Sequence, residues 1–569
     1  MSAAVAVVLA FLFYALAYRF YGGFLSRRIF ELDPHRATPA TLQEDGIDYV
    51  PTHRYVLFGH HWASITGLSP MLGPAIAVIW GWGPAMLWVV LGAVFIGCVH
   101  DMGALVVSVR SRGVSIGKVA EDLIGKRAKA LFLGIIFFGI SLAMGVFTLA
   151  LAGLFGGRFG SAVIPSVGLM LVAAGMGFLI HRRGFRLGPL TAVGFSLLVI
   201  LMFLGYAYPI EWKSQTGWKA SLLFYGFLAS VLPVWSLLQP RDFLNSLLLY
   251  IGLAVAFLGF FIMAPEFGAP ALQVHPEGAP PIFPFVFITI ACGAASGFHG
   301  LVASGTTAKQ LRKETDAKFI AYGGMMGESF LALLAVLATA AGFVHGQGRS
   351  PSDLWQEHYS EWSATDTTAA LGHFIDGTAR FVAELGVGLD MARAFVAVLV
   401  VSFALTTLDS ATRLLRYNVS EIGETVGLRS LGNRYVASIV AVLAIGFFAF
   451  YEVDGNPMGR VLWGLFGTTN QLLAALALLS ITVYLIKRGK NPWYTGLPAL
   501  FMMITTVVAM VENLGSFSSD FSFGPGTVWP LFVVGAILFA LSLWLLVEVV
   551  LVVVRERRLR RSGGHPRNR

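Results

Sequence analysis

Several ionisable residues stand inside long apolar stretches of this sequence, and the deepest of them is Glu328. An ionisable side chain within a membrane is costly and usually serves a function. At a helical rise of about 1.5 Å per residue, Glu328 lies well within its apolar stretch. We interpret it as a carboxylate that carries a proton; the alternative is a structural hydrogen bond to a neighbouring helix.

A second group of titratable residues lies toward one end of the apolar stretches. Histidine titrates near neutral pH, so these side chains could relay protons around a vestibule. For each of them alone, an interfacial cap or a surface group is the alternative. A catalytic metal site is not predicted, because a membrane di-iron enzyme needs more histidines at repeated short spacing. The group comprises His60, His61, His100, Asp101, His299 and Asp409.

Hydroxyl side chains near His299 offer a different coupling chemistry. Ser296, Thr306 and Thr307 could bind Na⁺ together with freed backbone carbonyls, since a hard cation prefers oxygen ligands. The alternative is that these hydroxyls hold helices together or cap a helix end. We therefore expect H⁺ or Na⁺ as the coupling ion, with H⁺ favoured, and no other cofactor.

The elements that must position these residues are membrane helices. The chain has 569 residues, of which 56% are hydrophobic and only 12% charged, whereas soluble domains have about 25% charged residues. The net charge of +9 does not indicate nucleic acid, because the basic residues are spread over short loops and the tail, as topology signals are. Cys98 and Cys292 lie in apolar stretches, so a disulfide framework is not indicated.

The apolar stretches also predict a topology. A spanning helix needs about 20 mainly apolar residues, which gives about fifteen spans. If the basic loop after the third span is cytoplasmic, alternate loops are rich and poor in Lys and Arg, with the N-terminus outside and the C-terminus inside. The predicted parts are a first helix and loop (1–50), a core (51–410), peripheral helices (411–554) and a basic tail (555–569).

One apolar stretch, Gly59–Pro74, carries helix-breaking residues in its middle. Its prolines and glycines predict unwinding around Thr66–Gly73. Irregular backbone inside a membrane must face protein or a water-filled cavity, and the N–H groups at the start of the next helix attract a carboxylate. The residues predicted to bind substrate there are Thr66, Gly67, Leu68, Ser69 and Gly73.

A second stretch, Ser230–Asp242, also contains prolines and is predicted to run in the opposite direction, about five spans later. Two interrupted helices at matched, opposed positions are the signature of an inverted repeat around a midplane binding site. Ser230, Trp235 and Ser236 would then form the wall that faces the first break.

Two further segments have structural interpretations. The loop Gly346–Thr365 contains Trp355, Tyr359 and Trp362, and it is either a lid or an interfacial segment with aromatic anchors. In Phe466–Gln471, Asn470 and Gln471 lie in the middle of a span, where such side chains bridge helices.

Motifs in a fixed order along the chain resemble the carbon starvation protein A (CstA) family. The resemblance implies a multi-pass transporter of the bacterial inner membrane, of the amino acid–polyamine–organocation type, for peptides or pyruvate during nutrient limitation. The matching motifs are Gly59–His61, Gly73–Ala75, Gly97–Asp101, Ser296–His299, Ser304–Thr307, Thr406–Ser410 with Arg413, and Leu465–Leu472.

The interrupted helices and the resemblance to the CstA family together predict an all-α membrane protein. Its core would be LeuT-like (APC-type), with five plus five inverted-repeat helices. Its predicted function is cation-coupled import of pyruvate or short peptides by alternating access, and not enzymatic. The alternatives are a metal-dependent membrane enzyme and an uncoupled channel; a sensor would carry a soluble signalling domain. The sequence does not distinguish a peptide substrate from pyruvate, and it does not indicate the oligomeric state.

Overall fold

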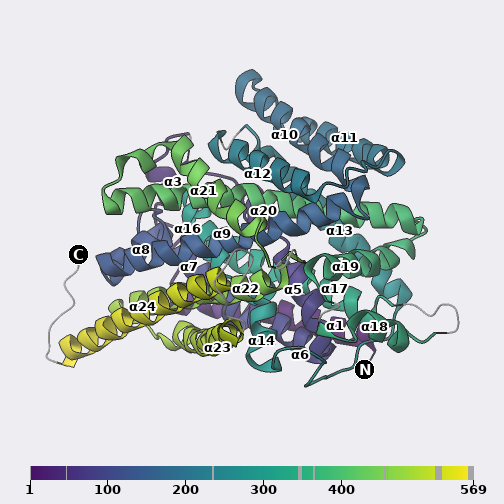
Figure 1. Ribbon diagram of the computed structural model, residues 1–569. Coiled ribbons are helices and arrows are strands. Elements are labelled where there is room, and N and C mark those ends of the chain that lie inside the picture. The colour runs from purple at the N-terminus through teal and green to yellow at the C-terminus, as the bar shows by residue number, and fades with distance from the viewer. Residues whose placement is uncertain are drawn as a thin grey trace.

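The computed structural model describes residues 2–46, 48–233, 236–343, 349–362, 365–453, 456–457, 459–519 and 528–561, and these are mostly helical (Figure 1). The helices up to residue 231 are α1 (Ala3–Leu16), α2 (Gly22–Phe24), α3 (Pro39–Leu42), α4 (Arg54–Ile65), α5 (Ser69–Ala77), α6 (Trp82–Leu87), α7 (Cys98–Arg110), α8 (Ile116–Leu123), α9 (Lys126–Gly156), α10 (Val163–Arg183), α11 (Leu187–Ala207) and α12 (Gln215–Val231).

The later helices are α13 (Leu238–Met263), α14 (Ile282–Thr289), α15 (Ala291–Ala294), α16 (Gly297–Gly305), α17 (Gly323–Ala341), α18 (Pro351–Tyr359), α19 (Thr367–Ala383), α20 (Leu389–Val426), α21 (Arg434–Ala449), α22 (Gly459–Lys487), α23 (Trp493–Ser519) and α24 (Trp529–Arg561). Short 3₁₀ or π turns extend or join them, at η1 (Ala17–Tyr21), η2 (Leu25–Ile29), η3 (Val78–Trp80), η4 (Trp88–Gly97), η5 (Gly160–Ala162), η6 (Thr307–Lys309), η7 (Glu314–Asp316), η8 (Lys318–Tyr322) and η10 (Arg429–Gly432). β1 (Glu452–Val453) and β2 (Asn456–Pro457) pair antiparallel.

The number of membrane-capable helices is lower than the predicted count. Within the described residues, 11 helices are long and apolar enough to cross a membrane, or up to 12 if one bent pair is a single span. Three further predicted spans are not among these helices. They are centred on Ala229 in α12, which has 17 residues, on Val442 in α21, which has 16, and on Cys292 in the interrupted segment α14–α16. Helix α21 is apolar but short, α12 is short with a polar first part, and the third segment is interrupted.

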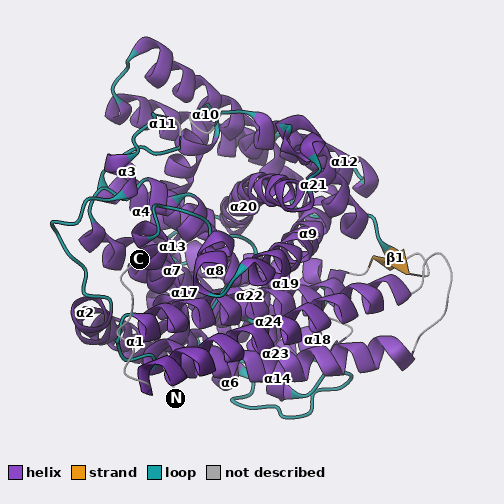
Figure 2. Cartoon of the chain, turned by 90° about the vertical axis from the view of Figure 1, so that its left-hand side faces the viewer, coloured by secondary structure: helices purple, strands orange, loops and turns teal. Residues whose placement is uncertain are grey.

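Burial divides the helices into an interior and a rim. The most apolar windows of α9 and α20 are 78% and 83% buried, whereas that of α11 is 11% buried. Both views show α10 and α11 at one edge of the molecule, where apolar side chains would face lipid (Figures 1 and 2). Helix α22 was predicted to be peripheral, but its window is 83% buried and it packs on α7, α9 and α16. That prediction was wrong, because apolar composition does not distinguish a lipid-facing helix from a buried one.

The loops predicted to share one side of the membrane do meet in space. Arg36 and Arg110 both pair with the buried Glu314, and Lys487 donates to the Leu123 carbonyl at 2.8 Å. At the opposite end, Tyr359 donates to the Ala75 carbonyl at 2.9 Å.

The loop around α18 is folded onto the helices. Trp355 and Tyr359 are buried, and their rings stack 5.3 Å apart. These rings face protein, so the interfacial-anchor interpretation is wrong for both residues. Residues 344–348 and 363–364 of this loop lie outside the described part.

The first interrupted helix is α4–α5, as predicted, with a bend of 49° between Arg54–Ile65 and Ser69–Trp80. Thr66 is extended, and regular structure resumes at Ser69. The break is therefore shorter than the predicted Thr66–Gly73. Gly73 lies inside α5, because Pro70 is at a position in the first turn where a missing N–H is tolerated.

The second interrupted helix is not the predicted one. Ser230–Asp242 joins the end of α12 to the start of α13, and α13 is a full-length helix of 26 residues. The interruption instead lies at Ala295 and Ser296, both extended, between α15 and α16. A helix can end without proline when glycine and serine provide little helical preference, and proline was the signal used in the prediction.

The two interrupted helices pack side by side in opposite directions. Half-helix α4 contacts α16, and α5 contacts α14 and α15. Three glycines from other segments lie directly on carbonyl oxygens of the second interrupted helix, where an added Cβ would collide. The pairs are Gly73 with Thr289, Gly97 with Ala294, and Gly467 with Ile288.

Candidate functional site

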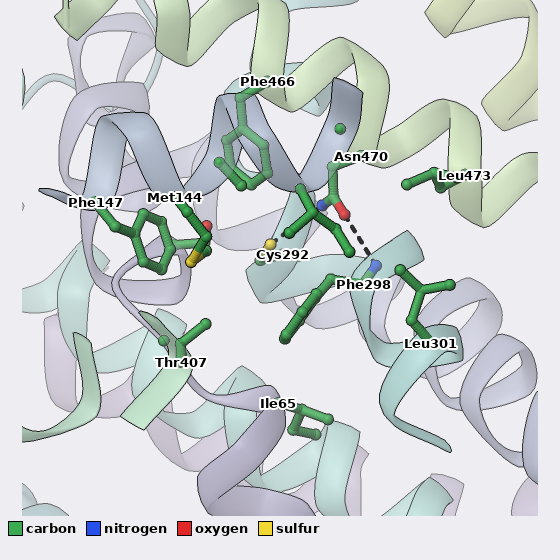
Figure 3. A pocket seen from close by; sticks show the side chains of 15 residues that line it. Ile65, Met144, Phe147, Cys292, Phe298, Leu301, Thr407, Phe466, Asn470 and Leu473 are labelled. Atoms are coloured by element: carbon green, nitrogen blue, oxygen red, sulfur yellow. Dashed lines mark hydrogen bonds between the residues drawn. The ribbon is translucent and has the colours of Figure 1, made fainter. Parts of the chain in front are cut away.

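The two breaks face a common cavity. Its space between atoms is about 420 Å³, most of it in gaps too narrow for a water molecule. Figure 3 shows side chains from α9, α20, α22 and both breaks around it. The lining residues are Ile65, Gly67, Ser69, Gly139, Ile140, Ala143, Met144, Phe147, Cys292, Phe298, Leu301, Thr407, Phe466, Asn470 and Leu473.

The first break presents unpaired polar groups at this cavity. The main-chain N–H groups of Gly67 and Ser69 have no backbone partner among the described residues. The hydroxyl oxygens of Thr66 and Ser69 are buried and also lack a partner there. A Cβ on Gly67 would lie 2.7 Å from Thr407 Oγ1, so the backbone needs glycine to approach α20. Unpaired N–H groups at a helix start suit an anion.

The second break is closed by a residue from outside the predicted core. Asn470 of α22 accepts hydrogen bonds from the Phe298 main-chain N–H at 3.1 Å and the Ser296 hydroxyl at 3.2 Å. Its amide also donates to Cys292 Sγ at 3.1 Å. The predicted bridging role of Asn470 is therefore seen, and Gln471 likewise donates to Thr505 of α23. A neutral amide satisfies the N-terminus of α16 where an anion could otherwise bind.

Beside the second break, imidazoles and carboxylates form a continuous chain. His100 Nδ1 lies 2.7 Å from Asp101 Oδ1, and His299 Nδ1 lies 2.9 Å from Asp101 Oδ2. His299 Nε2 is 2.7 Å from Glu328 Oε2, close but not aligned as a regular hydrogen bond. We call these four residues the histidine–carboxylate chain. They come from α7, α16 and α17, and none is exposed.

No permanent cation touches this chain in the described part of the protein: the contacts of its two carboxylates are all to histidine. With both carboxylates ionised and the imidazoles neutral, the chain would bury two negative charges. Uncompensated charge in a protein interior is very costly. The arrangement therefore favours bound protons, and the number of protons sets its charge.

His61 lies next to this chain but bonds elsewhere. Its Nδ1 is 2.8 Å from Thr307 Oγ1, and its ring faces Gly324 of α17. The other predicted hydroxyls are also engaged: Thr306 donates to the Val302 carbonyl of its own helix. Across the described residues, no group of three or more His, Cys, Asp or Glu side chains is arranged to hold a metal ion.

A second buried ionic cluster joins four helices. Arg241 at the start of α13 pairs with Asp409 of α20 through two contacts and with the adjacent Asp242 at 2.8 Å. Tyr225 of α12 donates to Asp409 at 2.8 Å. His60 of α4 lies 3.1 Å from Asp242 Oδ2. We call these five residues the arginine cluster.

The structure thus divides the predicted coupling residues between two places. His100, Asp101, His299 and Glu328 meet, whereas His60 and Asp409 belong to the arginine cluster. Sequence reasoning did not assign a role to Arg241, Asp242 or Tyr225. Consecutive charges next to a proline in an apolar stretch were the available signal for Arg241 and Asp242.

Residues of the predicted facing wall lie apart from the cavity. Ser230 donates to the Ser438 hydroxyl of α21 at 2.9 Å, and the Ser236 hydroxyl bonds the carbonyl of Pro233. Neither serine lines the cavity. Leu68 is buried at the first break without lining it, and Trp235 lies outside the described residues.

Comparison with known proteins decides the family. Residues 2–352 and 349–509 match the profile of the carbon starvation protein CstA family. The chain belongs to this family. A relative from Campylobacter jejuni, named peptide transporter CstA, is 34% identical over 90% of this chain and 80% of its own length. The Escherichia coli pyruvate/proton symporter BtsT is 33% identical over 88% of this chain and 80% of its length.

Solved structures are more distant from this family member. A manganese transporter from Eremococcus coleocola is 13% identical, with coverage of 90% of this chain and 99% of that one and a TM-score of 0.47. A likeness of that size carries no argument about the mechanism, which must be derived from the residues themselves.

Proposed function

We propose that this protein is a secondary active importer that carries a small carboxylate across the inner membrane, coupled to protons. The observation that carries the proposal is the contact between His299 and Glu328. His299 belongs to α16, one half of an interrupted helix that borders the cavity, and Glu328 belongs to α17. A proton bound there is positioned to influence the helix that borders the cargo.

The cargo carboxylate would lie against the N–H groups of Gly67 and Ser69 at the start of α5. These groups are unpaired among the described residues, and the helix dipole adds to the attraction. The Thr66 and Ser69 hydroxyls, buried without partners in the same part of the chain, would donate to the same anion. Gly73 lies too far into α5 to donate, because its N–H falls within the helix.

Cavity chemistry favours pyruvate over a peptide. Among the described residues, no acidic or basic side chain lines the cavity, so a free ammonium group would have no carboxylate partner there. A 2-oxo acid needs none, and it is the smaller of the two cargoes, so the narrow cavity would have to widen less to hold it. Relatives named for each substrate leave both classes open within the family.

One observation supports peptides as the second candidate. The rings of Phe147, Phe298 and Phe466 line the cavity, and aromatic faces attract ammonium groups. A peptide would then need the cavity to widen between α9 and α22. We rank this candidate below pyruvate because each ring also packs as an ordinary apolar side chain.

The interrupted pair α4–α5 and α14–α16 would form the centre of a LeuT-like core, with an alternating-access movement around it. Within this proposal, the end that carries Glu314 and Lys309 faces the cytoplasm, because basic loops gather there. H⁺ is preferred to Na⁺ because Thr306 and Thr307 already bond to protein groups.

The test is uptake of labelled pyruvate and of labelled dialanine into proteoliposomes that contain the purified protein. We expect pyruvate to accumulate when the outside is more acidic, and a protonophore to abolish accumulation. Unlabelled dialanine should compete weakly. Accumulation that follows a sodium gradient instead would contradict proton coupling, and the absence of uptake of either compound would contradict the proposal as a whole.

A further inference from the structure

Arg413 is a buried cation that meets no carboxylate within the part of the chain that the structure describes. Its side chain belongs to α20 and has a relative exposure of 6%. Its Nη2 atom donates to the Ala229 and Leu232 carbonyls at the end of α12, while Nε has no partner in the described part of the chain. No ion pair to Arg413 is present among those residues either. Buried charges are ordinarily paired, so this guanidinium has unused binding capacity.

Arg413 lines a polar pocket together with Lys309. The pocket is small, with a cavity volume of about 50 Å³. The Lys309 ammonium lies over the Tyr49 ring, 5.4 Å from its centre, and forms no ion pair in the described structure. Asp48 is the one acidic residue among the described residues that line the pocket, and His60 faces Asp242 of the arginine cluster. The charge of this lining is therefore positive even with His60 neutral.

The pocket is separate from the central cavity, although it lies close to it. None of its lining residues also lines the cavity. Ser64 and Val302 line the pocket, and their chain neighbours Ile65 and Leu301 line the cavity. The pocket thus lies where the half-helices α4 and α16 meet α20. It is toward the end of the molecule where the basic loops gather.

We propose that this pocket is a second binding site for a small carboxylate, held by Arg413 and Lys309 on the cytoplasmic side. The inference deepens the proposed function and rests on it for the direction of transport. Two sources share this chemistry: transported pyruvate that has left the central cavity, and a cytosolic carboxylate that is not transported. Arg413 supplies a planar donor pair for the carboxylate, and Lys309 supplies a point charge.

The test is equilibrium binding of labelled pyruvate to the purified full-length protein and to variants. Gly67→Val closes the central site, because its Cβ would press on Thr407 and Phe147. We expect two pyruvates per wild-type chain and one per Gly67→Val chain. In the Gly67→Val background, Lys309→Met and Arg413→Lys should each weaken the remaining binding by about tenfold, since a hydrogen bond to a charged group is lost or misdirected.

Controls separate binding from folding and from the proposed function. Lys313→Met removes an exposed neighbouring lysine and should leave affinity unchanged. Arg413 also holds carbonyl oxygens at the end of α12, so its variants could fold poorly. The Lys309 side chain bonds no such carbonyl, and Lys309→Met therefore keeps the test valid in that case. Unlabelled acetate that displaces pyruvate from Gly67→Val would assign the site to cytosolic carboxylates in general, and acetate without effect would assign it to the transported cargo.

Two results would overturn the proposal. One is Gly67→Val protein that folds but binds no pyruvate, although wild-type proteoliposomes transport it. The other is residual binding that Lys309→Met and Arg413→Lys both leave intact. Failure of the proposed function would look different, because wild-type proteoliposomes would then take up no pyruvate while the purified Gly67→Val protein still bound it.

Discussion

The histidine–carboxylate chain and the arginine cluster are both buried, ionic and shared between helices, but they differ in one component. The arginine cluster contains Arg241, whose charge is permanent. The histidine–carboxylate chain pairs Asp101 and Glu328 with imidazoles alone. One cluster holds its main ion pair at any physiological pH, whereas the other changes its charge with each proton gained or lost.

This difference separates two roles that the sequence alone had merged. A buried carboxylate paired with arginine joins helices and stays ionised, which suits a structural joint. A buried carboxylate that faces histidine can exchange a proton with it, which suits coupling. Location agrees with this division, because His299 lies at the second break beside the central cavity, whereas Arg241 lies where α12, α13 and α20 meet.

The largest effect is expected from Glu328→Gln. A gradient of one pH unit can drive up to about tenfold accumulation in a one-proton symporter, and this variant should show none. Pyruvate binding and exchange should stay within about twofold of wild type, because Glu328 does not line the cavity. Counterflow and pH-driven uptake in the same proteoliposomes measure the two properties separately.

The matched control for Glu328→Gln is Asp242→Asn, which removes a buried carboxylate from the arginine cluster. The folded fraction of the Asp242→Asn protein should retain pH-driven accumulation. Loss of coupling in Asp242→Asn with full coupling in Glu328→Gln would reverse the assignment of the two clusters.

Arg241→Gln should mainly affect stability. It leaves Asp409 and Asp242 buried without their cation, and breaking a buried pair in this way costs about 3–5 kcal/mol. Denaturation of the purified protein in detergent measures the loss. The double variant Arg241→Gln with Asp409→Asn should recover part of it, because one orphaned charge is removed. A loss too small to measure in Arg241→Gln would mean that the cluster is not a structural joint.

The smallest effect is expected from His60→Gln. His60 is partly exposed at the edge of the arginine cluster, with 12% of its side chain accessible. Arg241 still pairs with Asp242 and Asp409 when this imidazole is removed, so accumulation should stay within about twofold of wild type. The comparison variant His299→Gln interrupts the histidine–carboxylate chain and should abolish coupling. Equal losses in the two variants would remove the distinction between the clusters.

Membrane helices, the first break and the presence of titratable residues inside apolar stretches could be predicted because each leaves a local signal. Long apolar stretches, paired prolines and isolated charges are visible in the linear sequence. The second break at Ala295 and Ser296 carries no proline, so it was assigned to Ser230–Asp242 instead. Which charges meet could not be predicted, since the pairing of Arg241 with Asp409 joins residues far apart in the chain.

The position of α22 could not be predicted either, because lipid and protein interior select the same apolar side chains. Asn470 signalled a partner on another helix, but nothing in the sequence named the N-terminus of α16 as that partner. The interior of a membrane protein is thus defined mainly by contacts between distant residues, such as Asn470 with Phe298.

The glycines that lie on the second interrupted helix constrain how this protein can move. Where Gly73, Gly97 and Gly467 meet carbonyl oxygens, backbone touches backbone without side chains between them. Such close backbone contacts leave little room for sliding, so α5, η4, α22 and the α14–α15 half of the interrupted helix would move as one rigid block. In the proposed carrier, the movement that opens the cavity would then occur along the contact with α9, where longer side chains such as Met144 can rearrange.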